Sequence, residues 1–457
     1  MKYLEFLEKR SQYNNDSGFK PTFFPDKAFD FQKHLIDWTV RKGRSAEFAD
    51  CGLGKSLMEL AYAQNVVEHT NKNVLLTTPI AVGTQMLKEA EKFGIEANRS
   101  RDGKTKGKIT ITNYEQLHKF DPSDFEGIVC DESSILKNFK GKYKEVITIF
   151  SRKMKYRLLA TATAAPNDFI ELGTSSEALG YLGYMDMLSK FFINDMNNCS
   201  TNRRGRFTEA TQWRLKNHAH NAFWRWVTSW ARAIRFPSDL GFSNEGYILP
   251  PLIENDICIS DFDRSSQGLL FALPAKGESE RRTEQRHTIG IRCEKAAERA
   301  IDNDDYSVLW CNLNPEGDLL ERLIPDSVQV SGKDSDDAKE EKLTAFTEGK
   351  VKKLITKPKI GAWGLNWQHC NHTIFFPTHS YEQKYQAIRR FLRFGQERSI
   401  TIDNIFTDGD LNVIDNVKRK ERQAEKMFKR MVEEMNNSMS IRNTTNFDKK
   451  QELPEWL

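Results

Sequence analysis

Residues 49–56 read ADCGLGKS, and their types and spacing are typical of a phosphate-binding loop. Gly52 and Gly54 allow backbone N–H groups to approach a phosphate closely, and the start of the following helix favours an anion. In this pattern Lys55 reaches the β and γ phosphates of a nucleotide, and the hydroxyl of Ser56 binds Mg²⁺. Ala49 stands where the stricter pattern has its first glycine. We therefore expect the chain to bind ATP together with Mg²⁺.

A second chemical pattern lies near the other end of the chain, where residues 386–396 read QAIRRFLRFGQ. An arginine pair on a helix is ordinarily a solvated face. Here the flanking glutamines and Gly395 favour a different interpretation, in which Arg390 and Arg393 are arginine fingers on the γ-phosphate. Arg390 follows Lys55 by 335 residues, which is too far for one nucleotide-binding lobe. We therefore expect two lobes that share one nucleotide, the layout of a nucleic-acid motor.

Asp131 and Glu132 follow residues 127–130 (GIVC), which read as a buried strand. A carboxylate at the tip of such a strand is well placed to bind Mg²⁺ through a water molecule, and its neighbour can polarise the attacking water as a general base. An Asp-Glu pair after a strand is weak evidence alone. Because it stands 76 residues after Lys55, we interpret Asp131 as a metal ligand and Glu132 as the catalytic base.

Gln32, in the segment FDFQKHL, lies 23 residues before Lys55. An amide side chain can pair with the N6 and N7 edge of adenine, so Gln32 is predicted to select ATP. Phe29 or Phe24 is expected to stack on the base. The alternative for Gln32 is an exposed position on a helix.

Two further groups follow predicted strands. Thr161 and Thr163 are predicted to relay between the γ-phosphate side and the nucleic-acid side, although a plain turn fits nearly as well. Gly361, Gly364 and Asn366 follow the predicted strand 353–356. Glycines allow close approach to a phosphate of ATP or of a nucleic-acid strand. Gly364 and Asn366 are therefore assigned to the nucleotide site, with a simple turn as the alternative.

Parallel sheets would position these groups. Short β-rich segments alternate with helical patterns over most of the chain, which predicts an α/β fold with helices on both faces of parallel sheets. In such sheets, ligands bind beyond the carboxyl ends of the strands. Strands of the first sheet are expected at residues 74–78, 108–112, 127–130 and 157–161, and those of the second at residues 307–311, 327–330, 353–356, 372–376 and 400–406.

The alternation stops after about residue 175. Within residues 216–235, four apolar residues recur at helical spacing and predict one apolar stripe: Phe223, Trp226, Trp230 and Ile234. A buried core is favoured over a stacking platform for bases. Prolines at positions 237, 250 and 251 indicate a connector. From Ile414 onward, an amphipathic pattern predicts a final helix with a basic outer face, followed by a frayed polar tail.

Net charge points to no partner, because 68 basic residues stand against 64 acidic ones. Two segments are locally basic: residues 201–240 hold eight Lys or Arg against two Asp or Glu, and residues 417–430 hold seven against two. Such segments suit a phosphate backbone, and a solvated helix face is an equal alternative. Arg203, Arg204 and Arg206 are therefore predicted to contact nucleic acid, together with Thr161 and Thr163.

Seven cysteines without paired CxxC spacing indicate a reduced, intracellular protein. Residues 369–372 (HCNH) resemble half of a metal site, and the missing second half argues against zinc. The N-terminus lacks a basic region followed by an apolar run, and no segment approaches the ~20 apolar residues of a membrane span. We expect a soluble protein of the cytoplasm of a bacterial or virus-infected cell, without a membrane partner and with its protein partners left open.

Taken in order, the motifs of the chain resemble the series of superfamily-two helicases: FDFQ, GLGKS, LLTTP, ITNYEQL, DESSILKN, LLATATAAPND, GAWGLN and QAIRRFLRFGQ. The forms GLGKS, ITNYEQL and QxxxRxxRxGQ resemble the Snf-type DNA translocase branch. The DESS variant, FWRWVTSWARAIRFPSDLGF and SYEQKYQAIRRFLRFGQ are similar to compact phage-encoded helicases of this kind. The resemblance spans residues from about 25 to 435 and implies two RecA-like lobes, ATP, Mg²⁺ and DNA as the activating substrate. Two departures are Ser134, where the family usually has His, and TATAAPN in place of TGTPxxN.

The expected domains are an ATP-binding RecA-like lobe at residues 22–175, a helical insert and linker at 176–300, a second RecA-like lobe at 301–412, and a C-terminal helix and tail at 413–457. The leading hypothesis is an ATP-dependent DNA helicase or translocase, in which DNA-stimulated ATP hydrolysis drives movement on duplex or branched DNA. The alternatives are an RNA helicase and a nucleic-acid-binding module with an ATP-controlled switch.

Overall fold

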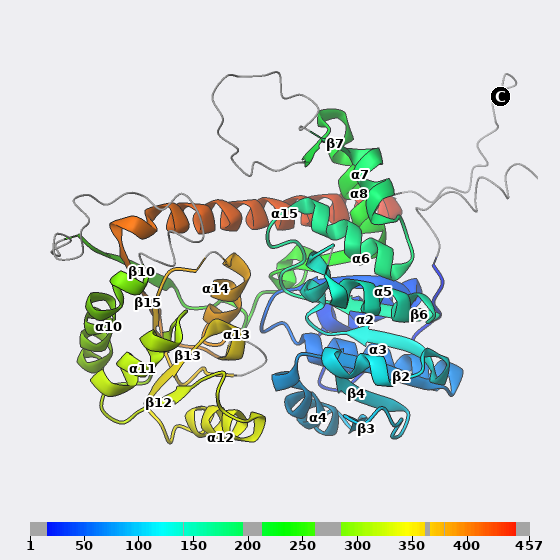
Figure 1. Ribbon diagram of the computed structural model, residues 1–457. Helices are drawn as coiled ribbons and strands as arrows, with labels where there is room; N and C mark the ends of the chain where they lie inside the picture. The colour runs from blue at the N-terminus through cyan, green and yellow to red at the C-terminus, as the bar shows by residue number, and fades with distance from the viewer. Residues whose placement is uncertain are drawn as a thin grey trace, which may run out of the picture.

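Two sheets lie side by side, each covered by helices (Figure 1). The computed structural model describes residues 16–139, 141–194, 213–260, 285–361, 366–378 and 380–444. Within the described residues, all strand pairs of these two sheets are parallel. This confirms the predicted α/β fold with two RecA-like lobes. Four residues that the sequence assigns to binding sites lie outside the described residues: Arg203, Arg204, Arg206 and Gly364.

The sheet of the first lobe has the strand order β3-β4-β2-β5-β6-β1-β9. Its inner strands are buried on both faces, because a hydrophobic cluster packs against each side, and such strands read as continuous apolar runs. The strands are β1 (Arg44–Ala49), β2 (Asn73–Thr78), β3 (Ala97–Arg99), β4 (Ile109–Asn113), β5 (Phe125–Cys130), β6 (Tyr156–Ala160) and β9 (Ala231–Ile234). The helices around them are α2 (Asp30–Lys42), α3 (Lys55–Thr70), α4 (Gly83–Lys92), α5 (Lys142–Arg152) and α6 (Leu172–Leu179).

The sheet of the second lobe has the order β10-β15-β14-β11-β13-β12 and its own two hydrophobic clusters. The strands are β10 (Leu252–Ile259), β11 (Ser307–Trp310), β12 (Ser327–Val330), β13 (Lys353–Thr356), β14 (His372–Phe375) and β15 (Ile400–Thr407). The helices are α10 (Ile289–Asp302), α11 (Asn314–Leu323), α12 (Asp336–Thr347), α13 (Pro358–Gly361) and α14 (Tyr381–Ile388). All nine strands that the alternation predicts for the two sheets are present, within one or two residues at their ends.

The segment between the two predicted lobes differs from the expected helical insert and linker. Strand β9 pairs with β1 in the first sheet, and β10 pairs with β15 in the second, so this segment supplies an edge strand to each lobe. Ile234 therefore lies on β9 and not on a helical stripe. The remainder forms α7 (Tyr184–Phe191), the antiparallel pair β7 (Phe192–Asn194) and β8 (Trp213–Leu215), and α8 (His220–Trp230). Trp226 and Trp230 are fully buried, which confirms that they are core residues.

The last helix, α15 (Leu411–Thr444), spans both lobes along the top of the molecule (Figure 1). Near its start, Lys418 forms an ion pair of 2.8 Å with Asp256 in the second lobe. Further along, Met427, Phe428 and Met431 are buried in a hydrophobic cluster of the first lobe. The predicted amphipathic helix is thus confirmed, and its apolar face helps to hold the two lobes together. Within the described residues, no helix combines the length and the apolar character needed to cross a membrane.

Candidate active site

The phosphate loop connects β1 to α3 at the carboxyl edge of the first sheet. Gly52 and Gly54 have φ angles of 89° and 82°, in the left-handed region that favours glycine. Lys55 is the first residue of α3, and its Nζ donates a hydrogen bond of 3.1 Å to the carbonyl of Ala49. Ser56 follows in the same turn. The loop therefore has the backbone geometry and the helix N-terminus that a bound phosphate requires.

Asp131 and Glu132 come directly after β5, at the same edge of the sheet. Both are buried, with 6% and 8% of their surface exposed. The N–H of Asp131 donates a 2.9 Å hydrogen bond to the carbonyl of Thr77 at the end of β2. Glu132 has a φ angle of 50°, which is uncommon for a residue with a side chain. Strained backbone of this kind concentrates at active sites, where the surrounding structure holds it in place.

The charges of the site influence one another strongly. Burial disfavours the cationic form of Lys55, but nearby groups outweigh burial and raise its pKa: Cys51, Glu132, Asp131 and Asp50. Burial raises the pKa of Asp131, and the charge of Glu132 raises it further, while Lys55 acts in the opposite direction. The site thus holds more carboxylates than cations, which suits an additional bound cation.

The oxygen ligands at this edge fit the predicted Mg²⁺. A hydroxyl on Ser56 and a carboxylate on Asp131 are ligand types that Mg²⁺ accepts, and Mg²⁺ usually takes its other ligands from phosphates and water. This agrees with the absence, among the described residues, of any group of three or more His, Cys, Asp or Glu side chains that could hold a metal ion alone. In residues 369–372, the thiol of Cys370 donates to the carbonyl of His372, and the His372 ring pairs with Asp403. These residues are packed within the second lobe.

The side chain of Gln32 is buried and hydrogen-bonded to the phosphate loop. Its Nε2 donates a 2.8 Å hydrogen bond to the carbonyl of Leu53, and its Oε1 accepts one of 2.9 Å from the N–H of Phe29. A Cβ on Gly54 would lie 2.3 Å from the same Nε2, so glycine is required here for close packing as well as for its φ angle. The structure therefore excludes the exposed alternative for Gln32. Its contact with adenine stays a prediction.

Phe29 belongs to an aromatic cluster built from three distant segments. Its ring lies 5.6 Å from the ring of Tyr247 and 6.2 Å from that of Phe394, measured between centroids. Phe29 is half exposed, whereas Phe24 packs against the core of the first lobe. Of the two phenylalanines predicted to stack on a base, Phe29 is therefore the better placed.

The second lobe places its arginine segment directly against the phosphate loop. A Cβ on Gly52 would lie 3.2 Å from the Cβ of Arg393, so the two backbones approach closely. The thiol of Cys51 lies 3.5 Å from Oε1 of Gln386, and Arg390 donates to the same oxygen at 3.1 Å. Burial, together with the charge of Arg390, lowers the pKa of Arg393. Residues more than 330 positions apart thus meet in one place, as the two motifs predict.

Glu132 is contacted from both lobes. Its Oε2 accepts a 3.3 Å hydrogen bond from the hydroxyl of Thr161 and one of 3.4 Å from Nε2 of Gln386. The hydroxyl of Thr163 donates to Glu382 on α14, 3.4 Å away. Both threonines are buried, so they do not face a surface open to nucleic acid, and their assignment as nucleic-acid contacts is not supported. The predicted relay between the γ-phosphate side and the nucleic-acid side stays a prediction.

Sequence reasoning missed several residues that join the lobes. Asp50, immediately before the phosphate loop, binds Arg389 and Tyr385 of the second lobe. Lys137, after β5, pairs with Glu382. A signal was present for one of them, because Arg389 adjoins Arg390 in the motif. The partners are not visible in the sequence, because these contacts depend on how the lobes are placed.

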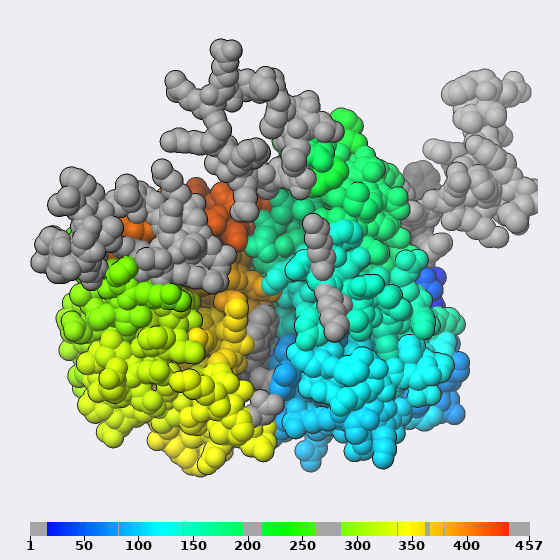
Figure 2. All heavy atoms as spheres, viewed as in Figure 1, coloured from blue at the N-terminus to red at the C-terminus, as the bar shows by residue number. Residues whose placement is uncertain are grey.

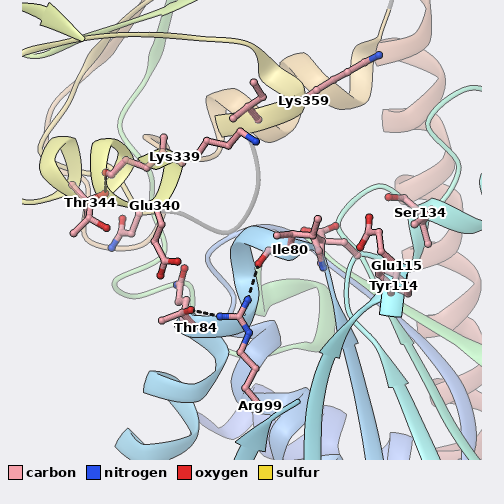
Figure 3. A pocket seen from close by; sticks show the side chains of 18 of the residues that line it. Ile80, Thr84, Arg99, Tyr114, Glu115, Ser134, Lys339, Glu340, Thr344 and Lys359 are labelled. Atoms are coloured by element: carbon pink, nitrogen blue, oxygen red, sulfur yellow. Dashed lines mark hydrogen bonds between the residues drawn. The ribbon is translucent and has the colours of Figure 1, made fainter. Parts of the chain in front are cut away.

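A large cleft lies between the lobes on the face shown in Figure 2, with a volume of about 800 Å³. Its wall includes Glu132, so it reaches one of the two buried carboxyl groups that follow β5. Six cationic side chains line it: Lys88, Arg99, Arg101 and Lys137 of the first lobe and Lys339 and Lys359 of the second. Figure 3 shows Arg99 bound to Thr84 and to the carbonyl of Ile80, with Lys339 and Glu340 across the cleft.

Asn366, predicted to contact the nucleotide, lines this cleft. Its Nδ2 donates a 3.2 Å hydrogen bond to Gln368, and its side chain is exposed. The predicted contact of Asn366 with the nucleotide stays a prediction. The cationic cleft residues themselves were missed, since they come from five separate segments of the two lobes and form no local pattern.

Residues 32–165 match the family model described as Type III restriction enzyme, res subunit. This match covers most of the first lobe, from Gln32 on α2 to Ala165 after β6. With the second lobe closing on its phosphate loop, the chain is an ATP hydrolase of the nucleic-acid-dependent class. No curated protein sequence matches the chain. Among solved structures, the Sulfolobus solfataricus SWI2/SNF2 ATPase core in complex with double-stranded DNA is similar at a TM-score of 0.42 and 16% identity, over 91% of this chain and 98% of that one.

Proposed function

We propose that this ATPase is a DNA translocase of the Snf type, in which DNA-stimulated ATP hydrolysis drives movement on duplex or branched DNA. The observation that carries the proposal is the meeting of the arginine segment of the second lobe with the phosphate loop of the first. A nucleotide bound at the loop would be enclosed by both lobes. Its hydrolysis would therefore change the contact between the lobes, which is what a motor needs.

The residues of the site divide the chemistry among them. Lys55 binds the β and γ phosphates, and Glu132 orients and polarises the attacking water. Thr161 and Gln386 hold the carboxylate of Glu132 from both lobes. Arg390 and Arg393 stabilise the charge that develops on the γ-phosphate in the transition state. Mg²⁺ on Ser56 and Asp131 would neutralise phosphate charge when it is bound.

The cleft between the lobes supports nucleic acid as the partner. It carries six cationic side chains from both lobes, together with five glutamates, one of which is Glu132. Cations spread along a groove suit a phosphate backbone and read little sequence. We favour DNA over RNA because the motif forms resemble the Snf-type branch.

The test compares ATP turnover with duplex DNA, forked DNA, single-stranded DNA and RNA of equal length, at several salt concentrations. We expect duplex or forked DNA to raise kcat most, with little sequence preference and with a stimulation that falls as salt rises. Stronger stimulation by RNA would transfer the assignment to an RNA helicase. Tight ATP binding without stimulation by any of the four would favour a switch module and overturn the proposal.

A further inference from the structure

One cluster joins the two lobes beside the phosphate loop through three residues to which the sequence motifs assign no role: Asp50, Tyr385 and Arg389. Arg389 donates a 2.7 Å hydrogen bond through Nη2 to Oδ2 of Asp50, and the hydroxyl of Tyr385 donates to Oδ1. The guanidinium of Arg389 also lies over the Tyr385 ring, 5.1 Å from its centroid. Asp50 is 4% exposed and Arg389 is 15% exposed. The contact is therefore buried, and both carboxylate oxygens of Asp50 accept hydrogen bonds from the second lobe.

The position of each partner connects this cluster to the chemistry. Asp50 stands between β1 and the phosphate loop, and its own Oδ1 accepts a 2.6 Å hydrogen bond from the N–H of Cys51. Arg389 immediately precedes the finger residue Arg390 at the end of α14. A displacement of Arg389 relative to Asp50 would therefore move the arginine segment relative to the loop. Positioning errors of about 1 Å at a reacting centre are known to cost roughly a hundredfold in rate.

Neither lobe needs this contact in order to fold. The first lobe has two hydrophobic clusters of its own, and the second lobe has two others. A buried ion pair contributes little net stability compared with apolar packing, but it is demanding about geometry and register. An arginine that forms a charged hydrogen bond and stacks on a ring has one preferred orientation. The cluster is thus suited to setting the register between the lobes and less suited to stabilising either one.

The other end of α14 is fixed to the first lobe as well. Glu382 pairs with Lys137 and accepts the hydrogen bond from Thr163, while Gln386 in the middle of the helix reaches Glu132. One face of α14 therefore contacts the segments after β5 and β6 as well as the phosphate loop. Attachment at both ends prevents the helix from pivoting about a single contact.

We propose that Asp50, Tyr385 and Arg389 form an interlobe latch that positions the arginine fingers on the phosphate loop. These are positioning residues, because they act through Arg390 and Arg393 and not on the nucleotide itself. The latch rests on the proposed function only in its use of the fingers for ATP hydrolysis. It holds whether the activating nucleic acid is DNA or RNA.

The test is a double-mutant cycle on ATP hydrolysis with Asp50→Asn, Arg389→Met and the double variant. Asn at position 50 keeps an acceptor for the N–H of Cys51 and removes the charge. We expect each single variant to lower kcat about tenfold, with the double variant no more than about twofold below the lower single one, because both remove the same contact. KM for ATP should stay within about twofold, and Arg389→Lys should recover only part of the rate, since it loses the planar fork.

A matched control is the exposed pair of Arg41 and Asp37 on α2, with an Nε–Oδ2 distance of 2.9 Å. Asp37→Asn, Arg41→Met and their double variant should leave kcat unchanged, and thermal unfolding should show that all six variants are folded. Independent, additive losses for Asp50 and Arg389 would overturn the latch, as would unchanged rates or an effect confined to KM. The cycle is measured on the basal rate as well. A wild-type protein that nucleic acid does not stimulate would therefore overturn the proposed function while the basal cycle still tests the latch.

Discussion

Two clusters of buried charge, one in each lobe, differ in how completely their members are paired. The cluster of the first lobe lies beneath the phosphate loop. Glu47 on β1 and Glu59 on α3 are fully buried, and none of their carboxylate oxygens has a hydrogen-bond partner within the described part of the chain. Burial raises the pKa of Glu47 to about 8 and raises the pKa of Glu59 well above its ordinary value. Because an ionised carboxylate can only accept hydrogen bonds, Glu59 or Asp131 would have to be protonated for the two side chains to hydrogen-bond to each other.

The cluster of the second lobe joins β11, β14 and β15. The His372 ring is held on both sides, with Nδ1 3.0 Å from the hydroxyl of Ser307 and Nε2 3.1 Å from Asp403. Asp403 also accepts hydrogen bonds from Arg299 and Asn255, each at 2.8 Å. Although burial disfavours its charge, these hydrogen bonds lower its pKa. Ser307 is fully buried, so this serine, histidine and aspartate are structural and not a hydrolytic triad.

We interpret the cluster of the first lobe as part of the reaction site and the cluster of the second lobe as structural support. In the second lobe the pKa of the central carboxyl is lowered, because the fold supplies every partner that its charge needs. In the first lobe the pKa values of Glu47, Glu59 and Asp131 are raised, because the fold buries these acids and supplies one lysine. Incompletely paired buried charge costs stability and persists where a ligand completes it. The expected ligand is the nucleotide with its cation.

The largest expected effect comes from removing the lysine of the unpaired cluster. Lys55→Ala should abolish ATP turnover, because the β and γ phosphates lose their main cationic partner in a closed site, where one such contact contributes roughly 3–4 kcal/mol or more. Turnover and thermal unfolding should be measured together. Full ATPase activity in a folded Lys55→Ala protein would remove the phosphate loop from the mechanism.

Glu132→Gln is the next change to make in the first cluster. The amide keeps the size of the side chain but cannot act as a base, so hydrolysis should fall by at least about a hundredfold. Binding of ATP, followed with a fluorescent analogue, should be retained, since Glu132 is assigned to the water and not to the phosphates. Loss of binding without loss of kcat would contradict this assignment.

The next prediction concerns the two arginines that the second lobe places at the phosphate loop, Arg390 and Arg393. Arg393→Ala or Arg390→Ala should slow hydrolysis with little loss of ATP affinity, because a finger acts mainly on transition-state charge. Fingers of this type contribute roughly 10³ to 10⁵ in rate. Lysine in place of either arginine should recover little, because the planar fork is lost. Normal hydrolysis by both alanine variants would show that the second lobe does not complete the site.

The paired cluster should respond in stability and not in catalysis. Asp403→Asn removes the charge that His372 and Arg299 contact, and should destabilise the protein by about 2 kcal/mol, read as a lower free energy of unfolding in urea. The pKa of Asp403 is lower in the folded state, so its contribution is present above the unfolded pKa of about 4 and is lost as pH falls toward the folded value. The difference between variant and wild type should therefore shrink below about pH 4. An equal loss of kcat at a temperature where both are folded would contradict a purely structural role.

Much of the fold was predictable because buried parallel strands are continuous apolar runs. Four strands of the two sheets were not among the nine predicted: β1, β3, β9 and β10. The last two show why the alternation has a limit. Residues of β9 continue the apolar stripe of α8, so the change from helix to strand leaves no signal. Residues of β10 are mostly exposed at the edge of the second sheet and show no apolar run. In both cases tertiary pairing, and not local pattern, decides the structure.

The residues of the site also fall into two groups, those that the local sequence could predict and those that it could not. Lys55, Asp131 and Glu132 were predictable, because their spacing relative to strand ends is a local property. The contact between Asp50 and Arg389 was not, since it depends on the placement of one lobe on the other. The same reason hides the cationic cleft, whose members come from both lobes. For Thr161 and Thr163, the pattern indicated the correct edge of the sheet but not which neighbours their hydroxyls would meet.

The smallest expected effect concerns one cation of the cleft, Lys359 on α13. It lines the cleft but is assigned to no step of hydrolysis, so Lys359→Ala should leave the basal ATPase rate unchanged. If it contacts a phosphate of bound DNA, the variant should need more DNA for half-maximal stimulation and should reduce the slope of log affinity against log salt by about 1. The matched control is Lys295→Ala on α10, where the lysine pairs with Glu298 and lies outside the cleft. Equal salt slopes for Lys359→Ala, Lys295→Ala and wild type would show that DNA does not reach this part of the cleft. In that case only the charges around the nucleotide would take part in ligand binding.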